Sequence, residues 1–145
     1  MAIAAYPFFG KVAEQIGRLT SLQGECTSAE IHRRIAETYG ERETAYRAVN
    51  RVIQTQASWG ALVRLDKGRR VIRRPMMAIR DDTLFAWLIE AAIRYAGRPL
   101  SVTTLHSSPV LFPFSLDGSL SLAVSATPTL ELHLGGSGSQ LVGIR

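Results

Sequence analysis

One stretch of the chain carries four side chains suited to reading the edges of base pairs. They are Arg47, Asn50, Arg51 and Gln54. At 100° per residue, all four project from the same side of a helix. An arginine fork matches O6 and N7 of guanine, whereas the amide of asparagine or glutamine matches N6 and N7 of adenine. The spacing therefore predicts a helix face able to form base-specific hydrogen bonds, with a merely solvated charged face as the simpler alternative.

A second group of basic side chains follows directly after this helix. It comprises Arg64, Lys67, Arg69, Arg70 and Arg73. Residues 61–80 hold seven basic residues and one acidic residue, a net charge of +6, whereas residues 1–60 carry +1 and residues 81–145 carry −2. Arginines in such a cluster could contact phosphates, which sets affinity and salt dependence without specifying sequence. The alternative is an edge hairpin protected from aggregation by charge, for which one or two charges usually suffice.

A helix and a tight hairpin must position these side chains, and the sequence predicts both. Residues 42–59 are expected to form one helix, and Gly60 can adopt the left-handed conformation that ends it. The strands ALVRL and RVIRR are joined by residues 66–69, whose glycine favours a tight turn. The residues expected on the buried side of the helix are Ala45, Val49, Val52, Ile53, Gln56 and Trp59.

Two further helices are predicted before this unit. Apolar residues recur at helical spacing from Pro7 to about Gln23, and proline suits the first turn of a helix. A short extended link follows. Thr27 and Glu30 then have the spacing of a capping box that starts a second helix, which Gly40 ends. The order helix, turn, helix is that of a helix-turn-helix.

Residues 81–145 repeat this order of elements with little sequence identity. Asp81-Asp82 places acid at the start of an apolar helix that ends at Gly97, and Ser101 can cap a short helix. Asp117 is expected to cap another short helix, Gly118–Ala126, before a hairpin closes the chain. The resulting class is mainly α with small β-hairpins, an α+β protein.

By these elements the first half resembles the winged helix-turn-helix superfamily of DNA-binding proteins. The matching segments are the capped helix Thr27–Tyr39, the turn at Gly40, the helix Arg42–Trp59 and the hairpin Leu62–Arg74. The whole sequence also looks like members of an uncharacterised bacterial family. The resemblance implies that the second helix of the motif enters the major groove of double-stranded DNA, while the hairpin, or wing, lies against the backbone or minor groove.

The repeated order extends this interpretation to two winged-helix domains in tandem, residues 1–75 and residues 81–145, joined by a linker at 76–80. A transcriptional regulator or an accessory factor of a DNA-processing complex would fit. Winged helices also serve as protein-docking modules, so a protein–protein adaptor in which nucleic-acid binding is incidental is the alternative.

The second domain is expected to contact protein, as a homodimer or with a larger partner. Its helix Gly118–Ala126 contains no Lys or Arg, so it has no charge that would attract the phosphate backbone of DNA. Phe112 and Phe114 lie between prolines in an apolar loop and are the candidate interface residues. The alternative is that these two side chains fill the core of their own domain.

The sequence shows no motif of an enzyme, of a cofactor or metal site, or of a membrane protein. The three histidines and the single Cys26 have no metal-ligand spacing, and no nucleophile elbow, P-loop or dinucleotide fingerprint occurs. Cys26 is expected to be a small buried hydrophobe. No apolar run approaches the ~20 residues of a membrane span, and no basic segment precedes the apolar N-terminus. We therefore expect a cytoplasmic, non-enzymatic protein without cofactor or metal.

Overall fold

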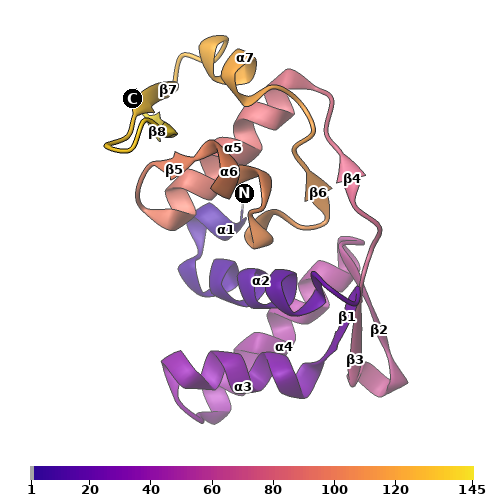
Figure 1. Ribbon diagram of the computed structural model, residues 1–145. Helices are drawn as coiled ribbons and strands as arrows, with labels where there is room; N and C mark the ends of the chain where they lie inside the picture. The colour runs from indigo at the N-terminus through magenta and orange to yellow at the C-terminus, as the bar shows by residue number, and fades with distance from the viewer. Residues whose placement is uncertain (1) are drawn as a thin grey trace.

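The computed structural model describes residues 2–145, which form a mixed α and β protein (Figure 1). The first half contains, in order, α1 (Ala2–Ala5), α2 (Pro7–Thr20), β1 (Glu25–Thr27), α3 (Ser28–Tyr39), α4 (Glu43–Ser58), β2 (Leu62–Leu65), the 3-10 turn η1 (Asp66–Gly68) and β3 (Arg70–Arg73). The second half contains β4 (Met77–Ala78), α5 (Asp82–Ala96), β5 (Leu100–Ser101), α6 (Val102–His106), η2 (Pro109–Leu111), β6 (Phe114–Ser115), α7 (Leu120–Ser125), β7 (Leu130–Leu134) and β8 (Gln140–Ile144). At this level the expected α+β class is confirmed.

Local signals set the ends of the first helices. Pro7 occupies the first position of α2, which ends at Thr20, earlier than the sequence predicts, because the next residues turn into Gly24 with a φ of +74°. The capping box of α3 is formed. The Thr27 hydroxyl accepts a hydrogen bond from the Glu30 amide, and the Glu30 carboxylate accepts one from the Thr27 amide.

Helix α4 has the two faces that its sequence predicts. Val49, Val52 and Ile53 are buried, and so is Gln56. Trp59 is an exception: it was expected on the buried side, but 66% of its surface is exposed. The reason is that Trp59 is already the C-terminal cap, outside the last helical turn, with Gly60 following it at a φ of +80°.

The hairpin after α4 belongs to a three-stranded antiparallel sheet with the strand order β1-β3-β2. In its register Cys26 lies opposite Val71, and Arg64 lies opposite Val71 from the other side. The turn places Asp66, Lys67 and Gly68 at φ values of +51°, +57° and +86°, so two non-glycine residues adopt a left-handed conformation there. Behind this turn, the side chain of Arg64 on β2 reaches α4 and donates to Gln54 at 3.4 Å.

The second half contains a helix, a short strand, two helices and a hairpin in the order seen in the first half, but β4 precedes α5, and η2 and β6 lie between α6 and α7. Its sheet is also antiparallel, with the strand order β5-β8-β7, and Asp81 and Ser101 cap α5 and α6 as expected. The predicted cap at Asp117 is wrong. The hydroxyl of Ser119 accepts from the Leu122 amide, so α7 starts at Leu120. The difference follows from N-cap geometry, because a serine just before the first helical turn can satisfy its free amides.

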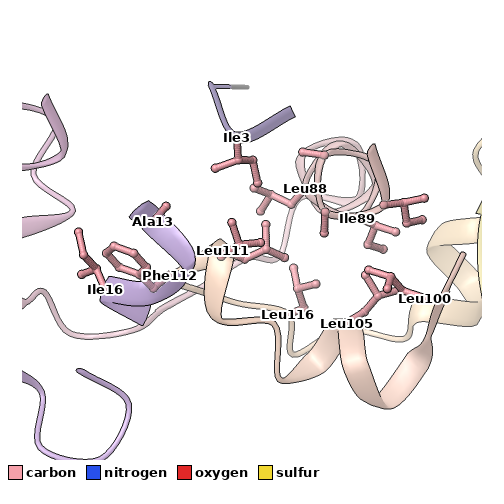
Figure 2. Packing of buried hydrophobic residues seen from close by; sticks show 14 of the residues in the cluster. Ile3, Ala13, Ile16, Leu88, Ile89, Leu100, Leu105, Leu111, Phe112 and Leu116 are labelled. Atoms are coloured by element: carbon pink, nitrogen blue, oxygen red, sulfur yellow. The ribbon is translucent and has the colours of Figure 1, made fainter. Parts of the chain in front are cut away.

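One hydrophobic core runs through both halves. In Figure 1, α1 lies beside α5, and the η2 loop packs on α2. Figure 2 shows Phe112 next to Ala13 and Ile16 of α2, while Leu111 lies on the side of Leu88 of α5. The approach is close enough that a Cβ atom on residue 17 would lie 1.9 Å from the carbonyl oxygen of Pro109, which requires glycine there.

The segment 76–80, expected to be a linker, takes part in this packing. Within it, β4 pairs in parallel with β6, so Met77 lies opposite Phe114. The amide of Met77 donates to the carbonyl of Pro113 at 2.7 Å, and the amide of Ile79 donates to that of Ser115 at 3.1 Å. The side chain of Ile79 is buried. Backbone hydrogen bonds and apolar burial therefore connect the two halves beyond the covalent chain.

Candidate nucleic-acid interface

The exposed face of α4 carries Arg47 and Arg51, both directed at solvent as expected. Arg47 is paired with Glu43 at 3.0 Å, and both side chains remain largely exposed. A surface pair one helical turn apart is weak, so an incoming acceptor can replace Glu43 at little cost. Arg51 forms no ion pair with any residue of the described chain. Both guanidinium groups are therefore accessible to a ligand.

The two amides predicted beside these arginines already have partners. Asn50 Oδ1 lies 3.2 Å from His32 Nε2, and the His32 ring stacks on Tyr46 with 4.0 Å between ring centroids. Gln54 Oε1 accepts from Arg64 at 3.4 Å. A bidentate contact with adenine uses both ends of the amide. Asn50 and Gln54 would thus have to give up these hydrogen bonds before reading a base.

His32 holds α3 and α4 together as a neutral ring. Burial lowers its pKa below the ordinary histidine value, and the charge of Arg64 acts in the same direction, while the hydrogen bond with Asn50 opposes them. The neutral imidazole stacks on Tyr46 and orients Asn50 from the helix next to it. Its role is therefore to fix the position of α4 and not to titrate near neutral pH.

The tip of the hairpin presents Lys67 and Arg69 to solvent. Neither side chain has an ion-pair or hydrogen-bond partner within residues 2–145. Arg64 is half-buried behind them and donates to the carbonyl of Gly68 at 3.4 Å. Arg64 thus supports the turn, while Lys67 and Arg69 remain free to meet an anion.

Arg70 connects two strands of the sheet. Its guanidinium pairs with Glu25 of β1 and, at 3.5 Å, with Asp66 of the turn. The hydrogen bond and the charge of Glu25 raise the pKa of Arg70. Glu25 lies opposite Ile72 in the register, which puts its carboxylate on the same face as Arg70. Arg70 is therefore engaged in ion pairs next to the turn of the hairpin.

Arg73 corrects the sequence prediction, which placed it among the DNA-binding residues. It turns inward and donates to the carbonyl of Gly17 at 2.9 Å, and its guanidinium carbon lies 5.4 Å from the centroid of the Phe112 ring. Burial lowers the pKa of Arg73. Strand alternation was the overlooked signal, because Arg73 must share a face with the fully buried Val71. This arginine stabilises the junction of the two halves.

Phe112 corrects a second prediction, that it forms a protein-interaction surface together with Phe114. Only 5% of Phe112 is exposed, since it lies between α2 and the side chain of Arg73. Phe114 is half-buried in β6. The apolar loop therefore fills the core at the junction of the halves, and Phe112 offers no contact surface to a partner.

Three further exposed arginines lie on or next to the helices of the motif, and the sequence analysis did not include them among the candidate DNA-binding residues. Arg33 and Arg34 lie on α3, and Arg42 directly precedes α4. An open groove of about 660 Å³ between α3 and α4 is bordered by Arg33 and Arg42. The helical period would have identified Arg33, because Ile31 and Ile35 define the buried face of α3 and residue 33 lies on the opposite side.

Cys26 is buried, and His106 has a backbone hydrogen-bond partner. Burial together with the nearby Glu30 and Glu25 raises the thiol pKa of Cys26 to about 12, so it remains protonated. The imidazole of His106 hydrogen-bonds to the Leu116 carbonyl at 2.8 Å. Within residues 2–145, no group of three or more potential ligands could hold a metal ion. None of the helices described there is both long and apolar enough to cross a membrane.

Comparison with known proteins gives no relative for this chain. No family model, curated protein or solved structure matches it.

Proposed function

We propose that this chain is a non-enzymatic protein that binds double-stranded DNA, with α4 in the major groove and the β2–β3 hairpin on the sugar-phosphate backbone. The observation that carries the proposal is the joint exposure of Arg47 and Arg51 on α4 and of Lys67 and Arg69 at the adjacent hairpin tip. These four cations come from two elements that the hydrogen bond from Arg64 to Gln54 connects. The protein acts as a transcriptional regulator or as an accessory factor of a DNA-processing complex.

The topology supports a tandem winged-helix architecture. Each half runs through a core helix, a short strand, two helices and a hairpin, and the corresponding sheets have the orders β1-β3-β2 and β5-β8-β7. The second copy differs by the segment 109–115, which inserts η2 and β6 between α6 and α7. A shared order of six elements with a shared strand order favours two units of one kind.

The contacts divide the basic residues into two roles. Arg47 and Arg51 project from the helix and are the candidates for base contacts. Lys67 and Arg69 contact phosphates and set the salt dependence. Arg64 and Arg70 are engaged within the hairpin, so their contribution is to hold its shape.

An affinity measurement on random duplex DNA over a series of salt concentrations tests the proposal. The intact chain should bind at low salt, and the double variant Lys67→Ala, Arg69→Ala should bind more weakly on all sequences. Its plot of log affinity against log salt should be flatter by about 1.8, because each phosphate contact contributes roughly 0.9. The variant Arg94→Ala, Arg98→Ala removes the same charge from the second half and should leave the slope unchanged. Absence of salt-dependent binding by the intact chain would reject DNA as the ligand.

The alternative function, a protein–protein adaptor, is favoured by the surface of the second half. Helix α7 occupies the position that α4 has in the first half, yet it carries no Lys or Arg. Leu122 on α7 and Leu134 at the end of β7 are largely exposed. On this basis the second half contacts protein, either a second copy of the chain or a larger partner. An adaptor without DNA affinity would self-associate or bind its partner with no change when Lys67 and Arg69 are replaced.

A further inference from the structure

An apolar cavity of about 260 Å³ lies at the junction of the two halves. The last turn of α4, β4, α5 and the loop that contains Phe112 all contribute to its wall. Its wall includes buried residues such as Leu88 and Phe112, which are labelled in Figure 2. Its rim carries Trp59, Met77 and Trp87, each at least half exposed. The cavity therefore has a mostly apolar wall and is open to solvent at a rim that includes both tryptophans.

Gln56 is the exception in this apolar wall. It lies on the buried face of α4 with only 5% of its surface exposed, and its Oε1 has no hydrogen-bond donor among the residues that the structure describes. A buried carbonyl without a donor is costly, and most such groups in proteins are satisfied. The residues known to line the cavity include no charged side chain. Such a wall suits an uncharged molecule, and a donor group on that molecule would satisfy Gln56 Oε1.

We propose that this cavity binds a small uncharged aromatic molecule whose N–H or O–H group donates to Gln56 Oε1. The size argues for one substituted ring or two fused rings, since an engineered cavity of roughly 150 Å³ already holds benzene. The indole rings of Trp59 and Trp87 offer faces and edges against which an aromatic ring packs favourably. The inference is independent of DNA binding, because no cavity side chain belongs to the candidate DNA contacts.

Phenol and anisole form a matched pair of probes for this site. Both present one aromatic ring, but only phenol has an O–H donor. The intact chain has two tryptophans, so its indole N–H signals in a ¹⁵N-labelled sample report on both sides of the rim. Phenol should bind saturably and shift both signals, and it should bind roughly tenfold more tightly than anisole, because anisole leaves the glutamine carbonyl without a donor.

A substitution at residue 56 separates the hydrogen bond from the apolar fit. Gln56→Leu should bind phenol and anisole with equal affinity, whereas the exposed Gln23→Leu should keep the preference for phenol. Should Gln56→Leu fail to fold, the comparison of the two probes on the intact chain decides alone. Failure of both probes to saturate, equal affinity on the intact chain, or a preference that persists in Gln56→Leu would overturn the inference. The inference would also be overturned if the chain formed a dimer through this cavity and phenol did not change the dimerisation.

Discussion

Replacing Arg73 by alanine is expected to make the protein easier to unfold while leaving the proposed binding to DNA unchanged. The guanidinium donates to the carbonyl of Gly17 on α2 and lies over the ring of Phe112 from the second half. Removing it would leave the Gly17 carbonyl without that donor and would expose one side of the ring. The expected damage is therefore to the junction between the halves and not to a binding surface.

The magnitude follows from these contacts. A hydrogen bond from a charged donor contributes ~1.5–3 kcal/mol, and a cation above an aromatic face contributes ~0.5–2 kcal/mol. The buried Nε of Arg73 has no acceptor within residues 2–145, which offsets part of this gain. We therefore expect the free energy of unfolding to fall by about 2–3 kcal/mol, with a decrease in Tm of about 4–12 °C for a domain of this size.

Urea denaturation followed by tryptophan fluorescence measures the stability, and the duplex titration at fixed salt measures the affinity. Arg69→Ala is the matched control, because its side chain is exposed and without a partner in the described chain. It should weaken DNA binding without changing the free energy of unfolding. If Arg73→Ala kept full stability and weakened DNA binding as much as Arg69→Ala, the assignment of Arg73 to the core would be wrong.

Three further predictions test other parts of the structure. Gly17→Ala should lower the free energy of unfolding by about 2 kcal/mol or more, because its Cβ would collide with the Pro109 carbonyl, whereas Gly136→Ala, which points into open space, should be neutral in the same denaturation assay. Arg47→Ala should cost ~1–3 kcal/mol of binding at a preferred DNA site and relax specificity there, as measured by competition among duplexes. Burial lowers the pKa of His32 in the folded state, so its contribution to stability is present above the ordinary pKa near 6.5 and is lost as pH falls through the lower folded value. His32→Gln should therefore flatten the loss of stability below pH 6.5 in acid titrations of the same denaturation assay.

Local signals account for the parts of the fold that were predicted correctly. Each of these signals acts within a few residues, so a short segment of sequence is enough to predict its effect. They are the capping box at Thr27, the glycines after α3 and α4, and the turn Asp66–Gly68. The alternation of apolar and polar positions along α4 likewise separates Val49 from Arg47 and Arg51. These features determine each half of the fold separately.

The packing between the halves was not predictable in the same way. The inward turn of Arg73 depends on a carbonyl 56 residues earlier and on a ring 39 residues later in the chain. The sequence around Phe112 is equally apolar whether the side chain faces water or α2. Only the tertiary contacts show that it is buried against α2. The sequence placed Gln56 on the buried side of α4 with the apolar residues. That its side-chain carbonyl has no donor within residues 2–145 follows only from the tertiary structure. Long-range contacts thus decided the residues that sequence reasoning misplaced.

The same packing restricts how the polar surfaces of the two halves can move. α2 contacts α3 and α4 as well as the η2 loop, and β4 pairs with β6 across the segment that would otherwise be a free linker. Domains joined by a flexible linker reorient readily, but here a rotation of the second half would open the core around Phe112. A protein bound to α7 or to the β7–β8 hairpin would therefore be held in one orientation relative to α4. If that protein is a second copy of the chain, the core and not a linker sets the distance between the two α4 helices, and with it the spacing of any paired DNA half-sites.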